Sequence, residues 1–246
     1  MKINLLIILL YLSVLVIFSC NSTKELNHEI IYNDSAHFEL QNNFRFTLNN
    51  GKGFNHPTYV LWEEDMSGNY LRTLYITKAY ASGIFGHQMV GDSVWMMKPS
   101  ESHQPAALPY WSHKKGLLSG DNLIPSPEHP FVDAYCGATA TKNFQFRSNI
   151  EPLDKNIRIL FEVNQAWDWN YYWTNSKYSD NYAYKHSAQP SIIYAVTINN
   201  TDSIYYLNPI GHGDAKGESG KLFTDLSNIT SAKEIFKSIK LEIKSN

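Results

Sequence analysis

The strongest constraint on the fold is a pair of strand-like runs on either side of a short polar turn. Residues 57–78 read PTYVLWEEDMSGNYLRTLYITK, and the runs at 59–63 and 70–77 are rich in aromatic and β-branched residues, which strands favour. The DMSGN segment between them has the small and polar residues of a tight turn. The sequence therefore predicts a β-hairpin here.

The rest of the chain continues this pattern of short strands. Further strands are predicted at 38–48, 144–147, 157–164, 191–198, 204–207 and 239–243, with connections rich in Pro, Asn, Ser and Gly. A capping-box pattern at Ser231–Glu234 predicts a short helix to about Lys237, and a second short helix is predicted at 105–111. Because no long helices alternate with the strands, we expect an all-β fold, an antiparallel, immunoglobulin-like β-sandwich.

The N-terminal segment predicts export from the cytoplasm. Residues 1–20 read MKINLLIILLYLSVLVIFSC, a lysine followed by an apolar run, which is typical of a secretory signal. The run is shorter than the roughly 20 apolar residues of a membrane-spanning helix. The junction at 17–20 resembles a bacterial lipobox, which implies acylation of Cys20 and cleavage before it. We expect a signal peptide at 1–19, a tether at 20–34, and a lipid anchor that holds the protein in the cell envelope, periplasmic or at the outer membrane.

Composition and charge exclude several classes of protein. Apolar residues make up 43% of the chain, which predicts a packed domain rather than a disordered one. The net charge of −2 argues against nucleic acid as a partner, because phosphates require a basic surface. Once Cys20 is acylated only Cys136 remains, so no internal disulfide is expected. We predict one β-sandwich domain over 35–246, with a first insertion at about 79–132 and a second at about 166–190.

A resemblance to known proteins rests on several segments. They are TYVLWEEDMSGNYLRTLYIT, PAALPYWSHKKG, VDAYCGATATKNF, FEVNQAWDWNYYW and QPSIIYAVTI. These segments, spread over residues 57–198, resemble a family of predicted periplasmic proteins of unknown function. Members of that family lie near genes for flavin transferases and PepSY proteins. The resemblance implies a flavin transferase or a PepSY-type membrane redox protein as a partner.

Residues 133–139, DAYCGAT, also resemble the acceptor motif of flavin transferases, Asp-x-x-(Ser/Thr)-Gly-Ala-(Ser/Thr). The resemblance implies that Asp133 is the motif aspartate, that Gly137 and Ala138 are its small pair, and that Thr139 carries FMN through a phosphoester. Cys136 stands where the motif has a hydroxyl residue, and a thiol is a weaker hydrogen-bond partner. The alternative interpretation is a tight turn in which Cys136 is a small buried hydrophobe.

A second candidate site is the second insertion, which contains the sequence QAWDWNYYW. Alternation places Glu162 and Asn164 on one face of the preceding strand, so their oxygens are candidate ligands for calcium or a sugar hydroxyl. The indole rings are candidate stacking surfaces, and the alternative is an aromatic core with tyrosine hydroxyls at its rim. The candidate ligand-binding residues are Trp167, Asp168, Trp169, Asn170 and Trp173.

A third segment, PIGHGDAKGESGK at 209–221, contains His212, Asp214 and Glu218 but lacks the Gly-Lys-Ser/Thr ending of a phosphate-binding loop. We interpret it as a long solvated turn. The sequence has no Gly-x-Ser-x-Gly elbow and no histidine pair at HxH or HExxH spacing. We therefore expect an extracytoplasmic lipoprotein without catalytic machinery, acting as a ligand-binding or assembly module. The alternative is a periplasmic electron carrier with FMN on Thr139.

Overall fold

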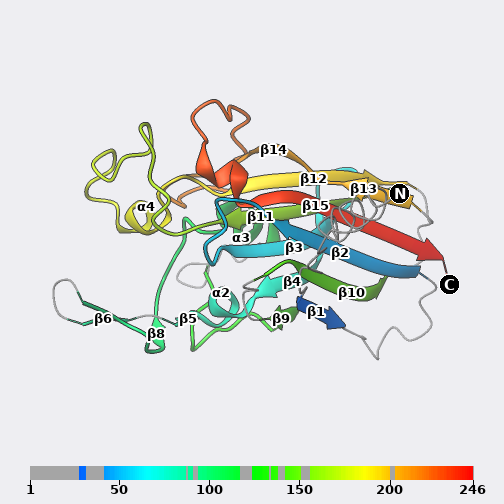
Figure 1. Ribbon diagram of the computed structural model, residues 1–246, viewed down its shortest axis with the longest axis horizontal. Helices are drawn as coiled ribbons and strands as arrows, with labels where there is room; N and C mark the ends of the chain where they lie inside the picture. The colour runs from blue at the N-terminus through cyan, green and yellow to red at the C-terminus, as the bar shows by residue number, and fades with distance from the viewer. Residues whose placement is uncertain are drawn as a thin grey trace, which may run out of the picture.

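Two large β-sheets pack face to face and form a β-sandwich (Figure 1). The computed structural model describes residues 28–31, 42–86, 88–90, 94–116, 124–132, 134–137, 142–150, 156–199 and 203–245. The five-stranded sheet contains, in order, β1 (His28–Ile31), β10 (Phe144–Ile150), β2 (Asn42–Asn50), β15 (Phe236–Ser245) and β13 (Ser203–Tyr206). The six-stranded sheet contains, in order, β14 (Asn208–His212), β12 (Ile192–Ile198), β11 (Ile157–Asn164), β3 (Thr58–Glu64), β4 (Tyr70–Thr77) and β9 (Tyr135–Gly137).

The other elements are short. Two small pairs of strands are β5 (Ile84–Phe85) with β8 (Ser100–Glu101), and β6 (Gln88–Val90) with β7 (Val94–Met96). The helices are α2 (Lys78–Ser82), α3 (Pro109–Lys115), α4 (Tyr182–Ser187) and the 3₁₀ helix η3 (Ser231–Glu234). In Figure 1, α4 and the β6–β7 pair lie at the end of the sandwich opposite the C-terminus.

The predicted all-β sandwich is confirmed, and so is its hairpin. β3 and β4 pair antiparallel around the turn that begins at Asp65, whose carboxylate accepts hydrogen bonds from the backbone N–H groups of Ser67 and Asn69, each at 2.8 Å. Two pairings at the sheet edges are parallel, β1 with β10 and β4 with β9. These two parallel pairings differ from the antiparallel arrangement that the sequence predicts.

The main hydrophobic core fills the space between the two sheets. Alternate residues of β2, β10 and β15 face alternate residues of β3, β4, β11 and β12, as the two-residue period of strands requires. Aromatic rings pack edge to face or tilted through this layer, for example Phe46 with Phe161 at 5.5 Å between centroids. The largest fully buried members are Phe44, Phe46, Leu48, Tyr59, Tyr75, Phe144, Phe146, Phe161 and Tyr184.

A second core covers the outer face of the six-stranded sheet. There, Val60, Trp62 and Leu160 pack against side chains of the first insertion, among them Tyr80 and Trp111. β3, β11 and much of β12 are therefore buried on both faces, which explains why they are nearly continuous apolar runs rather than alternating ones. The first insertion thus adds a third layer to the sandwich.

The predicted helices were placed incorrectly. Ser231–Glu234 forms only one 3₁₀ turn, and β15 begins at Phe236, so the chain is not helical to Lys237. Thr230 rather than Ser231 occupies the N-cap position, and it makes no side-chain capping bond because its hydroxyl donates to Gln189 Oε1 at 3.2 Å. The Ser231 hydroxyl, the predicted cap, instead donates to Asp168. The helix predicted at 105–111 begins four residues later, at Pro109, a residue that helices favour in their first turn.

The N-terminal predictions fall outside the described residues. They are the signal peptide at 1–19, the acylated Cys20 and most of the tether at 20–34. Within the described ranges, no helix combines the length and the apolar character that crossing a membrane requires.

Candidate functional site

A pocket of about 500 Å³ lies between the second insertion and the chain after β14. One wall comes from the residues that follow Asn170, and the other comes from the predicted turn segment at 209–221 and the residues after it. The structure therefore joins two segments that the sequence analysis treated as separate candidates. Aromatic and charged side chains make up most of the wall: Tyr172, Trp173, Tyr178, His212, Phe223, Asp214, Lys216 and Asp225.

Asn170 fixes the position of the aromatic wall. Its side-chain oxygen accepts hydrogen bonds from the backbone N–H groups of Tyr172 at 2.9 Å and Trp173 at 2.7 Å, which is a side-chain-capped turn. Its amide nitrogen donates to Gln189 Oε1 and to Thr230 Oγ1, both at 3.0 Å. All of these contacts of Asn170 are internal, so its role is to position the rings of the pocket.

Asp168 links the start of the second insertion to η3 through a hydrogen bond. Its carboxylate accepts a hydrogen bond from the Ser231 hydroxyl, and Gln189 Nε2 donates to the same hydroxyl at 2.7 Å. Burial raises the pKa of Asp168, and the bonds from Ser231 and Gln189 oppose that rise. Asp168 is therefore part of a half-buried polar network and does not line the pocket.

Trp173 is the predicted ligand-binding residue that lines the pocket. Its side chain is 7% exposed and makes an edge contact with Tyr172 at 5.0 Å between ring centroids. It also contacts the His212 ring at 5.9 Å, so it touches both walls. The indole N–H is buried and has no acceptor among the described residues. Buried donors nearly always find a partner, so this wall is not arranged for packing alone.

The other two tryptophans of the second insertion lie elsewhere. Trp167 is 49% exposed, has a left-handed backbone (φ 65°) and packs on the His186 ring at 5.0 Å. Trp169 is partly buried against the main core and contacts the Tyr184 ring at 5.6 Å. Neither tryptophan lines the pocket.

His212 and Phe223 form the opposite wall. Their backbones exchange two hydrogen bonds, at 2.8 and 2.9 Å, and their rings stack at 5.2 Å with only 13° between the planes. Burial lowers the pKa of His212, although Asp225, Asp214 and the Gly213 carbonyl act in the opposite direction. The net effect makes the imidazole harder to protonate than a free one. Because His212 ends β14 and is buried, the segment at 209–221 is not one long solvated turn as predicted.

The DAYCGAT segment is described only in part. Asp133, Ala138 and Thr139 lie outside the described residues, while Cys136 and Gly137 belong to β9. A side chain at Gly137 would collide with the Tyr75 ring and hydroxyl. The small residue is thus required by packing against β4. Whether Thr139 carries FMN stays a prediction.

Cys136 packs as a half-buried residue against the second core. Its sulfur lies 3.4 Å from the backbone oxygens of Phe131 and of Ala134. Burial raises the pKa of the Cys136 thiol, and nearby Lys78 lowers it to a smaller extent. A thiol with a raised pKa is a poor nucleophile at neutral pH, which is consistent with a packing role.

Glu162 and Asn164, the candidate calcium or sugar ligands on β11, are both engaged by the protein. The fully buried Glu162 carboxylate accepts hydrogen bonds from the N–H of Tyr110 at 3.2 Å, the N–H of Trp111 at 2.7 Å and the Ser191 hydroxyl at 2.6 Å. These two N–H groups belong to the first turn of α3, where amides lack helical partners. Asn164 donates to the Gln189 carbonyl at 2.9 Å. Glu162 thus caps α3 from a neighbouring strand.

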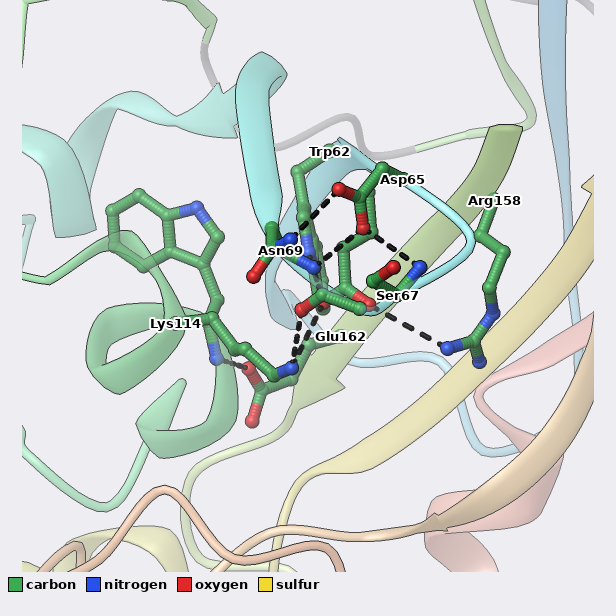
Figure 2. A network of polar contacts seen from close by, with 10 residues as sticks. Trp62, Asp65, Ser67, Asn69, Lys114, Arg158 and Glu162 are labelled. Atoms are coloured by element: carbon green, nitrogen blue, oxygen red, sulfur yellow. Dashed lines mark hydrogen bonds and ion pairs between the residues drawn. The ribbon is translucent and has the colours of Figure 1, made fainter. Parts of the chain in front are cut away.

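A second buried carboxylate, Glu64, lies at the end of β3. It accepts a hydrogen bond from the Trp62 indole at 3.1 Å. Lys114 Nζ lies 3.9 Å from its Oε1, and Arg158 Nη1 lies 3.5 Å from its Oε2. Figure 2 shows Lys114 and Arg158 approaching this network from opposite sides. With two cations and an indole as partners, Glu64 is a structural ion-pair group rather than an open site.

Neither a metal centre nor a relative identifies the site. Among the described residues, no three His, Cys, Asp or Glu side chains gather closely enough to hold a metal ion. Comparison of the chain with protein-family models, with curated proteins and with solved structures gives no match. The function of the pocket therefore has to be inferred from its own residues.

Sequence reasoning identified some pocket residues and missed others. It named Trp173 as a contact residue and noted His212 and Asp214, but it gave no reason to pair them. Tyr172 and Tyr178 belong to the same aromatic run as Trp173, and that run was the available signal. Phe223 and Asp225 lie in a stretch without any distinguishing pattern, so only the fold reveals them.

Proposed function

We propose that this protein is an extracytoplasmic, lipid-anchored binding module that holds a small ligand in the pocket beside the second insertion. The single observation that carries the proposal is the pocket of about 500 Å³ with an aromatic wall and charged groups around it. Ligand sites are typically concave and aromatic with a few placed polar groups. The N-terminal pattern of residues 1–20 supports the envelope location and the anchor, and no catalytic machinery is part of the proposal.

Preorganisation of the wall supports this proposal. The Asn170 turn fixes the backbone of Tyr172 and Trp173, and the hydrogen-bonded pair of His212 and Phe223 fixes the other side. Tyr172 and Phe223 remain 42% and 40% exposed. A ligand therefore meets rings that are already in place, which reduces the entropy lost on binding.

The test is calorimetric titration of the purified full-length protein with a panel of neutral sugars, amines and carboxylates, followed by tryptophan fluorescence. Tyr172→Ala removes an exposed ring from the pocket, so we expect at least about a ten-fold loss of affinity, or about 1.4 kcal/mol. Tyr206→Ala is the matched control, because this tyrosine is 57% exposed on β13 and does not line the pocket. Equal affinity of the Tyr172→Ala and Tyr206→Ala proteins, or no binding across the panel, would contradict the proposal.

A further inference from the structure

Three aromatic rings of the pocket wall lie around a cation, the ammonium of Lys177, although Lys177 itself is not one of the residues that line the pocket. Lys177 Nζ lies 3.1 Å from the centroid of the Tyr172 ring, 4.6 Å from that of Trp173 and 6.0 Å from that of Tyr178. A cation within about 6 Å of an aromatic face is attracted by the electron-rich ring. The three rings therefore form a cage for an ammonium group, and a side chain of the protein fills it.

Lys177 is held weakly in this cage. Among the described residues no carboxylate forms an ion pair with it, and its Nζ donates one long hydrogen bond, 3.5 Å, to the Tyr172 carbonyl. Cation–π attraction at an exposed site is worth about 0.5–1 kcal/mol in all. The lysine side chain is long and flexible, so a competing cation displaces it at small cost.

The charged groups of the pocket favour a cationic ligand. Asp214 and Asp225 line the wall, and hydrogen bonds from Ser227 hold the pKa of Asp225 below its usual range. Lys216 Nζ lies 5.9 Å from the Tyr178 ring and 2.8 Å from Glu218, so its positive charge is compensated. Asp214 and Asp225 therefore give negative charge to the pocket that the cage rings line.

We propose that the pocket binds a small organic ammonium ion, a quaternary or alkylated amine, whose cationic head replaces Lys177 Nζ among Tyr172, Trp173 and Tyr178. Asp214 and Asp225 supply the compensating charge. Lys177 is then a built-in competitor that occupies the cage when no ligand is bound. This inference rests on the proposed function and names its ligand class.

Lys177→Gln tests the competition directly, because glutamine keeps much of the side-chain length and removes the charge. Freeing the cage from an attraction of about 0.5–1 kcal/mol is expected to tighten binding of an ammonium ion about two- to five-fold. Lys185→Gln is the matched control, because Lys185 is an exposed residue of α4 whose ammonium, unlike that of Lys177, lies over no aromatic ring among the described residues.

The experiment is calorimetric titration of the three full-length proteins with choline, with its neutral isostere 3,3-dimethyl-1-butanol and with a set of neutral sugars. The inference predicts that choline binds, that the isostere binds at least about ten-fold more weakly, and that only Lys177→Gln tightens choline binding. Equal affinity for choline and the isostere, or no effect of Lys177→Gln, overturns the inference. Sugar binding without choline binding overturns it and leaves the proposed function intact, whereas no binding of any ligand overturns both.

Discussion

The two long insertions are both rich in aromatic residues, yet they use them differently. Described parts of the first insertion, at 79–132, bury Tyr80 and Trp111 on the outer face of the six-stranded sheet. The second insertion, at 166–190, leaves Tyr171 73% exposed and Tyr182 62% exposed. Aromatic content alone therefore does not separate a core-forming segment from a binding surface.

The indole N–H groups differ between the two regions. Beside the first insertion, the Trp111 indole donates to Thr73 Oγ1 at 2.9 Å and the Trp62 indole donates to Glu64. In the second insertion, the Trp173 indole has no acceptor among the described residues, and Tyr172 faces a pocket. The Tyr80 hydroxyl of the first insertion is also buried without a partner among the described residues, so an unused donor alone does not mark a binding surface. What distinguishes the second insertion is that Tyr172, a ring that lines the pocket, stays 42% exposed.

The largest expected effect comes from Glu162→Ala, which removes the hydrogen bonds that hold α3 of the first insertion against β11. It leaves the N–H groups of Tyr110 and Trp111 buried without an acceptor and opens a small cavity, so we expect a loss of about 3–5 kcal/mol in the free energy of unfolding. Chemical denaturation at pH 5 measures it, with Glu101→Ala as control, because Glu101 is an exposed residue of the same insertion. If Glu162→Ala does not fold, Glu162→Gln, which keeps one acceptor, gives a smaller measurable loss of about 1–3 kcal/mol. Equal stability of the Glu162 and Glu101 variants would show that the hydrogen bonds between Glu162 and α3 do not stabilise the fold.

The same carboxylate predicts a pH dependence of stability. Burial raises the pKa of Glu162 to about 7, while the hydrogen bonds from Ser191, Trp111 and Tyr110 limit the rise. A carboxyl whose pKa is higher in the folded state holds its proton more tightly there, so its stabilisation is complete below about pH 4.5 and is lost as pH rises toward 7. The shift corresponds to a decline of about 3 kcal/mol over that range.

Denaturation of the wild type and Glu162→Gln at several pH values between 5 and 7.5 isolates the pH-dependent contribution of Glu162 to the free energy of unfolding. His186 and His212, whose pKa values burial lowers, contribute in the opposite direction in both proteins and cancel in the difference. The difference between the two curves should shrink at high pH, where the wild type has lost the contribution. Parallel curves would assign the pH dependence to other groups.

Local patterns predicted the strands better than they predicted the site. The hairpin and the strand at 157–164 were recognisable because aromatic and β-branched residues in short runs indicate strands without knowledge of the fold. The capping box at Ser231 failed because the hydroxyl has a tertiary partner in Asp168, 63 residues away in the chain. Local propensity is a weak guide wherever a distant group competes for the same hydrogen bond.

The pocket required long-range information for the same reason. Trp173 and His212 are brought together by the order of β11, β12 and β14 across the sheet, and nothing within either segment indicates the other. Glu162 was a candidate ligand for calcium or a sugar hydroxyl because it shares one strand face with Asn164, but its carboxylate is used by the N–H groups of α3. A charged residue within an apolar strand run indicates that its side chain has a partner. Only the fold shows whether that partner is part of the structure or a ligand.

The smallest expected effect concerns the second insertion. It tests whether the turn that Asn170 stabilises contributes to ligand binding in the pocket. Asn170→Ala removes the bonds to Tyr172, Trp173, Gln189 and Thr230, so we expect a loss of about 1–3 kcal/mol in the free energy of unfolding. Asn170→Asp keeps the acceptor for the two backbone N–H groups but loses the donor, so it should retain more ligand affinity than Asn170→Ala. Denaturation and calorimetry measure both properties, and Asn175→Ala, an exposed change in the same insertion, should stay within about 0.5 kcal/mol of wild type. If Asn170→Ala binds ligand as tightly as the wild type, the turn contributes to stability alone, and the two insertions differ less than their surfaces indicate.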